Sequence, residues 1–420
     1  MKTFEQLESN VRSYCRSFPT VFTRARGSHL YDRDGREFID FFAGAGVMNY
    51  GHNHPQLAEA LIGYIQEGGI AHGLDMATEA KERFLQTLER VVLEPRGLKY
   101  KVMFPGPTGT NAVESALKIA RKVTGRRSVV AFTNAFHGMT LGSLAITGNA
   151  KKRNGAQVPL NHTTRAAFDG YHGPDVDTVA LLDRELSDTS SGIDKPAAII
   201  VETVQGEGGV NVASAEWLRR LQAVASKHGA LFIIDDIQVG CGRTGHFFSF
   251  EEAGITPDVV CLSKALSGFG LPLAVVLMRP ELDQWNPGEH NGTFRGNNHA
   301  FVTGARAFEL FWGDGALGAE IHKKGELVRE RLQSIASSVG GQVRGRGLIW
   351  GLEMPDAKQA GAACRVAFDR NLIIETSGPS DEVIKVLPPL NIETPVLEQG
   401  LDIVADAVDH VQGKTLKAVG

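Results

Sequence analysis

The chain has 420 residues, of which 42% are hydrophobic and 22% charged, a composition typical of globular enzymes and not of disordered, collagenous or coiled-coil chains. Its 44 Lys and Arg residues against 48 Asp and Glu give a formal net charge of -4 without long runs of either sign, so we expect no nucleic-acid and no membrane partner. Four cysteines without Cys-x-x-Cys spacing and an N-terminus without an apolar signal core predict a cytoplasmic protein.

The first half of the chain predicts a hairpin and then a mostly parallel sheet. Residues 31–41 (YDRDGREFIDF) predict a hairpin with its turn at Asp34 and Gly35. Amphipathic stretches at 111–123 and 214–228 predict helices that end at Gly125 and Gly229. They lie among short apolar runs, which predict buried strands at 101–104, 128–132, 197–202, 230–235, 258–262 and 273–278.

After about residue 305 the pattern changes. Helices are predicted at 301–311 and 320–338, followed by short apolar runs at 341–354 and 383–392. We therefore expect an α/β fold with a large sheet domain and a smaller α+β domain. The predicted division is 1–50 as a segment that joins the small domain, 51–305 as the large domain and 306–420 as the C-terminal small domain.

Three features predict a phosphate-bearing cofactor. The segment FPGPTGTNAVESALK (104–118) has the form of a strand, a loop and a helix N-terminus, which is an anion cradle, although an ordinary capped turn explains it too. Asp235 ends a buried strand, where it is either a ligand or a helix cap, and Lys264 follows the next strand, where a solvated lysine is the alternative. An acid for a pyridine nitrogen, an amine for an aldehyde and a cradle for phosphate together are what pyridoxal phosphate needs.

Other motifs are weaker. The segment 240–245 matches Gly-x-Gly-x-x-Gly, but it does not open a helix directly after a strand, as a dinucleotide site requires. Ser115 and Lys118 match Ser-x-x-Lys without the other serine-hydrolase motifs. His52 and His54 have no obvious carboxylate set, so we expect a turn there and no metal site.

At these residues the sequence resembles the class III aminotransferases, pyridoxal-phosphate enzymes of fold type I with the architecture of aspartate aminotransferase. The similarity extends from about residue 20 to 395, and its clearest block is DDIQVGCGRTG at 235–245. The resemblance implies that Asp235 pairs with the pyridine nitrogen and that Lys264 carries the cofactor. It also implies roles for other residues: phosphate binding by Gly109 and Thr110, ring contacts by Phe136 and Ile237, a bond from Gln238 to the phenolic oxygen, and a contact from Thr293 to the phosphate of a partner subunit's cofactor.

Departures from the family pattern concern the substrate. Lys385 occupies the place where many members have an arginine for the substrate carboxylate, so either Lys385 binds that carboxylate more weakly or another cation binds it. Glu207 is expected to gate with Lys385. Gly44 and Gly46 are expected on the substrate side. The implied assembly is a homodimer or a dimer of dimers whose active site is shared between subunits.

Five longer segments resemble one branch of the family, which acts in ectoine biosynthesis: RSYCRSFPTVF, DFFAGAGVMNYGHNHP, FPGPTGTNAVESALKIARK, AFHGMTLG and TFRGNNHAF. This resemblance implies transfer of the amino group of L-glutamate to L-aspartate 4-semialdehyde, giving 2-oxoglutarate and L-2,4-diaminobutyrate. The alternatives are aminotransferases for ornithine, acetylornithine or 4-aminobutyrate, an aminomutase of glutamate 1-semialdehyde, and a non-catalytic regulator on the same fold.

Overall fold

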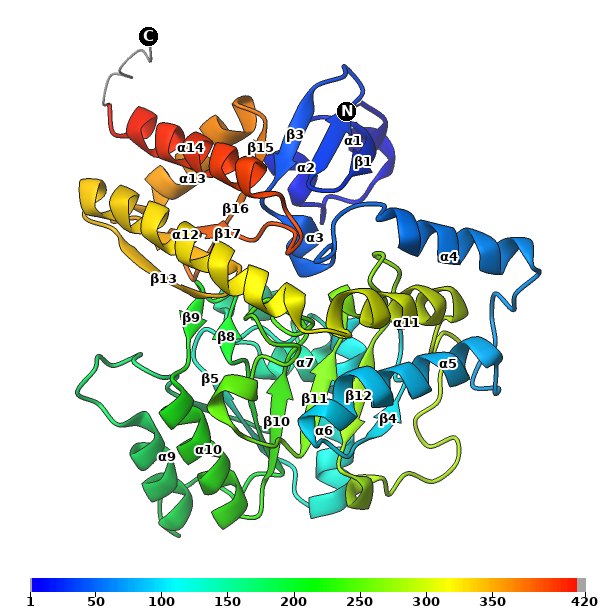
Figure 1. The fold of residues 1–420 in the computed structure, drawn as a ribbon. Coiled ribbons are helices and arrows are strands. Elements are labelled where there is room, and N and C mark those ends of the chain that lie inside the picture. Colours follow the sequence, from blue (N-terminus) through cyan, green and yellow to red (C-terminus); the bar gives the residue numbers. More distant parts are fainter. Residues whose placement is uncertain (1, 414–420) are drawn as a thin grey trace.

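The computed structural model describes residues 2–413 and is organised around one seven-stranded sheet. Figure 1 shows this sheet in the centre, with the N-terminal and C-terminal elements together above it. In spatial order the sheet contains β4 (Lys101–Met103), β12 (Val275–Met278), β11 (Val259–Leu262), β10 (Leu231–Asp235), β7 (Ala198–Val201), β5 (Val129–Phe132) and β6 (Thr163–Ala166).

All six predicted strands of this sheet are present, and the mostly parallel arrangement is confirmed. Only β12 runs antiparallel to both of its neighbours. The seventh strand, β6, was not predicted, because its sequence TTRA at the sheet edge is polar and only partly buried.

Successive residues of the strands point into two different cores, which is why the runs are apolar throughout. On β10, Ile233 packs with α6 (Gly109–Thr124) on one face, and Phe232 packs with α10 (Ala215–Lys227) on the other. The second core also includes α5 (Glu79–Thr87) and α11 (Asn298–Trp312). The remaining helices of this region are α4 (Pro55–Gln66), α7 (Leu141–Ile146), α8 (Ala150–Asn154) and α9 (Thr178–Ser187).

The predicted helix ends are confirmed at Gly125 and Gly229, which have left-handed φ values of 67° and 63°. The helix predicted at 301–311 begins earlier, at Asn298, because the Asn297 side chain accepts a hydrogen bond from the Ala300 N–H and caps it. Helices α4 and α5 were not predicted.

The N-terminal and C-terminal segments share one sheet. The predicted hairpin is confirmed as β2 (His29–Asp32) paired with β3 (Glu37–Asp40), and β3 pairs in parallel with β15 (Leu372–Ile373). Figure 1 shows the blue N-terminal strands beside the orange and red C-terminal elements. This pairing supports the proposed grouping of residues 1–50 with the small domain, and the boundaries at 50 and 305 stay a prediction.

The other C-terminal elements form a second layer of strands and helices. An antiparallel sheet has the order β13 (Gln342–Arg346), β14 (Ile349–Glu353), β17 (Val383–Val386) and β16 (Glu375–Ser377). Three helices lie with it: α12 (Ala316–Val339), α13 (Ala357–Asp369) and α14 (Thr394–Val411). The shorter α-helices and strands are α1 (Lys2–Leu7), α2 (Tyr14–Ser17), β1 (Phe22–Arg26), α3 (Ala43–Gly46), β8 (Val204–Gln205) and β9 (Asn211–Val212). A π-helix at Leu88–Leu93 and 3-10 helices at Glu94–Arg96, Glu251–Ala253, Lys264–Ser267 and Pro280–Leu282 are also present.

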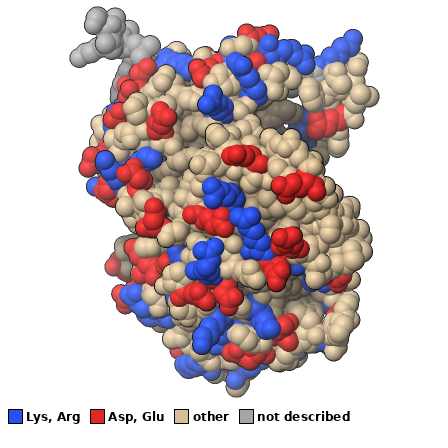
Figure 2. All heavy atoms as spheres, turned by 45° about the vertical axis from the view of Figure 1, so that its right-hand side comes forward, with Lys and Arg blue, Asp and Glu red and all other residues tan. Residues whose placement is uncertain are grey.

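The surface carries no extended field of one sign on the face that Figure 2 presents, where basic and acidic side chains are intermixed. No helix within residues 2–413 is long and apolar enough to cross a membrane.

Candidate active site

A cavity that is open to solvent lies where the parallel strands of the large sheet end. Ligands of open α/β sheets bind at this edge. Phe136 follows β5, Glu202 follows β7, Asp235 ends β10, and Lys264 lies two residues after β11. Eight of the predicted residues line the cavity: Gly109, Thr110, Phe136, Glu207, Asp235, Ile237, Gln238 and Lys264.

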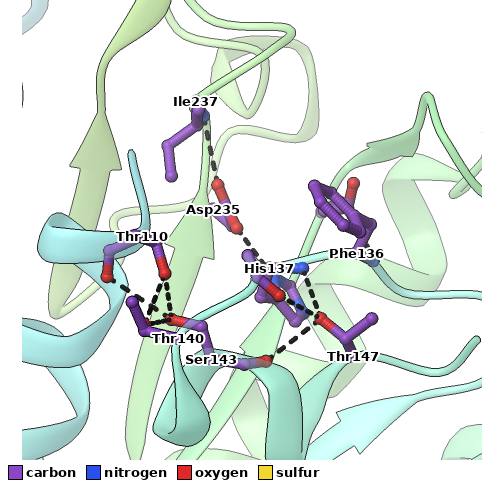
Figure 3. Close-up of polar contacts among 10 residues, drawn as sticks. Thr110, Phe136, His137, Thr140, Ser143, Thr147, Asp235 and Ile237 are labelled. Atoms are coloured by element: carbon purple, nitrogen blue, oxygen red, sulfur yellow. Dashed lines mark hydrogen bonds and ion pairs between the residues drawn. The ribbon is translucent and has the colours of Figure 1, made fainter. Parts of the chain in front are cut away.

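Asp235 is a buried carboxylate, only 4% exposed, and it is fixed from two sides. Its Oδ2 lies 2.6 Å from Nδ1 of His137, and its Oδ1 accepts a hydrogen bond of 3.2 Å from the Ile237 N–H. Figure 3 shows both contacts and the position of Ile237 above the carboxylate. A carboxylate held in this way can stabilise a cationic ring nitrogen in the cavity.

Lys264 begins a short 3-10 turn and has a left-handed φ of 49°, which is strained for a residue with a side chain. Burial lowers the pKa of its ammonium, and the negative charge of Glu207 offsets part of that effect. A lysine with a lowered pKa supplies more of the neutral amine, which is the form that attacks an aldehyde or removes a proton.

The N-terminus of α6 lines the cavity. Thr108 and Asn111 make a capping box, and Gly109 and Thr110 open the helix beside the cavity. A Cβ at Gly109 would lie 2.9 Å from Ile237 Cγ2, so a side chain there would displace the residue next to the cavity. The Thr110 hydroxyl lies within hydrogen-bond distance of the Thr140 and Ser143 hydroxyls, as Figure 3 shows. Free N–H groups, hydroxyls and the helix dipole together favour a phosphate here.

Phe136 forms another wall. Its N–H donates a hydrogen bond of 2.9 Å to Oε1 of Glu202, which fixes the backbone beside the ring. Burial, reinforced by the negative charge of Asp235, raises the pKa of Glu202 well above its usual value. Glu202 therefore favours its neutral form.

An ion triad closes the side of the cavity nearest the small domain. The fully buried Nζ of Lys385 lies 2.8 Å from Oε1 of Glu207 and 2.8 Å from Oε1 of Glu375. Glu375 and Lys385 are cross-strand partners of β16 and β17. Burial acts to raise the pKa of Glu207, but the charges of Lys385 and Lys264 outweigh it and lower that pKa. Burial likewise acts to lower the pKa of Lys385, and the two carboxylates raise it instead.

Replacing Lys385 by alanine is expected to lower the free energy of unfolding by about 1.5–3 kcal/mol, because two partly buried carboxylates lose their shared cation. Urea unfolding followed by circular dichroism measures this. Lys195→Ala, which removes an exposed lysine, is the control. Equal stability of the two variants would show that the triad does not stabilise the protein.

Gln238 is oriented toward the triad. Its Nε2 donates hydrogen bonds to Oε1 of Glu207 at 2.9 Å and to the Ala45 carbonyl oxygen at 3.1 Å, while its Oε1 is buried and has no partner among the described residues. Both amide hydrogens are thus used, so the predicted bond to a phenolic oxygen requires one of them to be released and stays a prediction.

Four predicted residues lie outside the cavity lining: Lys385, Gly44, Gly46 and Thr293. Lys385 is behind Glu207, Gly44 is next to the Ala45 carbonyl that Gln238 contacts, and Thr293 is exposed on the surface. Their expected roles stay predictions. Gly46 lies closer to the site, since a Cβ there would be 3.3 Å from the Gln238 carbonyl oxygen.

The weaker motifs have structural explanations. Gly242 has a φ of 110°, and a Cβ there would lie 2.6 Å from Trp312, so the glycines of 240–245 serve a tight turn against a helix. Ser115 donates its hydroxyl hydrogen bond to the Asn111 carbonyl within α6. His52 lies 2.8 Å from Asp40, and no metal-binding group of three ligands occurs within residues 2–413.

Asp236, next to Asp235, points away from the cavity toward Ser249. Its carboxylate accepts a hydrogen bond of 3.1 Å from the Ser249 N–H. Burial raises the pKa of Asp236 from 3.8 to about 7. Between these values the folded state holds a proton that the unfolded state has lost, so this group makes the protein less stable as the pH rises through that interval.

Asp236→Asn is therefore expected to flatten the fall in unfolding free energy between about pH 4 and pH 7. Denaturant unfolding of wild type and variant at several pH values measures the difference. Parallel pH profiles would show that Asp236 titrates alike in both states.

The fold and this site define an aminotransferase. The model of the family "Aminotransferase class-III" matches residues 12–408, and the chain belongs to this family. The fold is that of a Bacillus anthracis aminotransferase (TM-score 0.87, 23% identity, 97% of each chain). An ornithine aminotransferase from Toxoplasma gondii, described with partial occupancy of pyridoxal phosphate at its active site, has a TM-score of 0.85 at 25% identity and covers 98% of this chain and 94% of its own.

Curated relatives are more similar still. A diaminobutyrate–2-oxoglutarate transaminase from Nocardia farcinica is 60% identical over 97% of this chain and 94% of its own length. One from Virgibacillus pantothenticus is 56% identical over 99% of this chain and 100% of its own. The expected family and fold type are thereby confirmed.

Three residues of the site were not predicted. His137, which fixes Asp235, and Glu202, which fixes the Phe136 backbone, follow strands β5 and β7, and the rule that selected Asp235 could have selected them. Glu375 lies within a short strand and carried no signal, because only the register of β16 and β17 places it on Lys385.

Proposed function

We propose that this protein transfers the amino group of L-glutamate to L-aspartate 4-semialdehyde, with 2-oxoglutarate and L-2,4-diaminobutyrate as products. The observation that carries the proposal is the joint placement of Asp235 and Lys264 at neighbouring strand ends of one cavity, beside the N-terminus of α6. Curated diaminobutyrate–2-oxoglutarate transaminases that are 54–60% identical to this chain support the choice of substrates.

The cofactor is pyridoxal phosphate, and the residues present fit it in three ways. The N–H groups of Gly109 and Thr110 and the hydroxyl of Thr110 suit the phosphate, Asp235 suits the protonated pyridine nitrogen, and Lys264 suits the aldehyde. Phe136 and Ile237 are the two ring contacts in the proposal. When bound, the cofactor supplies an electron-accepting ring for the carbanion that forms as the substrate loses its Cα proton.

The side chains around the cofactor have separate roles in the proposed reaction. Lys264 Nζ removes the proton from the amino-acid Cα in the first half-reaction and delivers a proton to the carbon that receives the amino group in the second. Its lowered pKa allows both transfers near neutral pH. Asp235 holds its negative charge at the ring nitrogen, and His137 keeps that carboxylate in place. Glu207 and Lys385 are the proposed gate between the two substrates, since glutamate carries a carboxylate on its reacting carbon and the semialdehyde does not.

The test is an amino-donor and acceptor panel with the purified, cofactor-loaded protein. Glutamate with aspartate 4-semialdehyde should give diaminobutyrate at a higher kcat/KM than reactions with ornithine, acetylornithine or 4-aminobutyrate as donors. Preference for one of those donors would assign another ω-aminotransferase, and isomerisation of glutamate 1-semialdehyde without a second keto acid would assign the aminomutase.

We further propose a homodimer, or a dimer of dimers, in a reducing cytoplasm. Exposed apolar side chains of α4 and the segment after it support a subunit contact: Ile62, Ile65, Ile70, Leu74 and Met76. Phe294, which is 65% exposed and next to Thr293, touches His72 of the same region with ring centroids 5.4 Å apart. The four free cysteines support the compartment. Light scattering across a concentration series measures the assembly, and a monomer at all concentrations would contradict it.

A further inference from the structure

Lys152 is not itself part of the cavity lining, but it contacts a side chain that is, and within residues 2–413 no opposite charge lies beside it. It lies on α8, downstream of the Phe136 loop, and its Nζ is 4.2 Å from the centroid of the Phe136 ring. Phe136 lines the cavity. The Lys152 side chain is partly buried, and within residues 2–413 its ammonium has no hydrogen-bonded acceptor and no carboxylate within ion-pair distance. An aromatic face stabilises a cation but leaves its hydrogen-bond donors free.

The other candidate cation, Lys385, is already engaged. Two of the three donors of its ammonium face Glu207 and Glu375, and its side chain has no exposed surface. The triad carries a net charge of -1 when all three members are ionised. A second carboxylate arriving there meets negative charge, whereas at Phe136 it meets the positive charge of α8, whose sequence AKKRN contains three basic residues and no acidic one.

The two proposed substrates share one geometric feature. In glutamate the reacting carbon is C2, and the side-chain carboxylate carbon, C5, is three bonds away. In aspartate 4-semialdehyde the reacting carbon is C4, and the carboxylate carbon, C1, is also three bonds away. One cation at a fixed distance from the reacting centre can therefore serve both half-reactions without rearrangement.

We infer that Lys152 binds this shared carboxylate and so sets the substrate length that the enzyme accepts. The inference rests on the proposed function, because it takes its substrates from there. It leaves the triad with one task, the discrimination of the carboxylate on the reacting carbon of glutamate.

Lys152→Met tests the inference, because methionine keeps an apolar stem on Phe136 and removes the charge. We expect KM to rise about 10- to 100-fold for both glutamate and aspartate 4-semialdehyde, the usual effect of losing a charge-assisted hydrogen bond, with a much smaller change in kcat. Alanine as donor and propanal as acceptor lack the shared carboxylate, so their slow reactions should keep the wild-type KM. Lys152→Arg should restore part of the affinity, and Lys151→Met, which removes the exposed neighbour on α8, should change nothing.

Binding of glutarate to the cofactor-loaded protein, measured by calorimetry, gives a readout independent of turnover. Its Kd should rise in Lys152→Met by the same factor as the KM of glutamate. The inference is overturned if both stay within twofold of wild type, or if alanine and propanal lose as much as the dicarboxylate substrates, which would mean that Lys152 acts through Phe136 alone. Should the wild-type protein fail to convert glutamate, the proposed function falls, and glutarate binding still decides the role of Lys152.

Discussion

Lys264→Ala is expected to lose transaminase activity by at least about 10²- to 10⁴-fold in kcat, the range associated with a positioned proton-transfer group. The expectation follows from the position of Lys264 at the strand end, in the cavity and with a pKa lowered by burial. Stopped-flow measurement of the half-reaction with glutamate checks it, since product release does not limit that signal.

A second readout separates attachment from catalysis. After borohydride reduction, wild-type protein should retain the cofactor on a peptide that contains Lys264, whereas the variant should retain none. Lys99→Ala, at an exposed lysine, should behave like wild type in both assays. A covalently retained cofactor in Lys264→Ala would assign the attachment to another lysine.

Asp235→Asn is expected to lower kcat by about 10²- to 10³-fold, the cost of losing one preorganised electrostatic contact from a buried side chain. The substitution keeps the shape and leaves an amide that can still contact His137, so what is lost is the negative charge opposite the ring nitrogen. Single-turnover rates with glutamate measure the effect, and cofactor content by absorbance verifies that the variant is loaded.

Asp236→Asn is the matched control for that experiment. Asp236 is equally buried and adjacent in sequence, but it contacts Ser249 and not the cavity, so its neutralisation should change the pH dependence of stability and leave kcat within a few-fold of wild type. If the two variants were equally active, the charge of Asp235 would have no special role in catalysis.

Much of the fold could be predicted because its elements carry local signals. The six buried runs of the large sheet and the helices that end at Gly125 and Gly229 have spacing and punctuation that depend only on neighbouring residues. Strand β6 lacked such a signal, because an edge strand needs apolar residues on one side at most. Helix α4 does carry a local signal, since it begins at Pro55 and proline is favoured in the first helical turn.

The residues of the site also differ in how far the sequence predicts them. Asp235 and Lys264 could be selected because the residue that follows a buried parallel strand must lie at one edge of the sheet. His137, which fixes Asp235, also follows a strand, and the same rule could have selected it. Glu375, ten positions before Lys385, could not be selected, because only the register of β16 and β17 places it beside Lys385.

The sequence by itself determined the sheet, the chemistry of its strand ends and, by resemblance, the family. Only the tertiary structure decided which charges neutralise one another. It places Lys385 between two carboxylates and, within residues 2–413, leaves Lys152 on an aromatic ring without a counter-ion, whereas the sequence offers Lys385 or another cation for the substrate carboxylate. The physical reason is that local propensity follows from adjacent residues, whereas the availability of a charge depends on every group packed within a few ångströms of it in the folded chain.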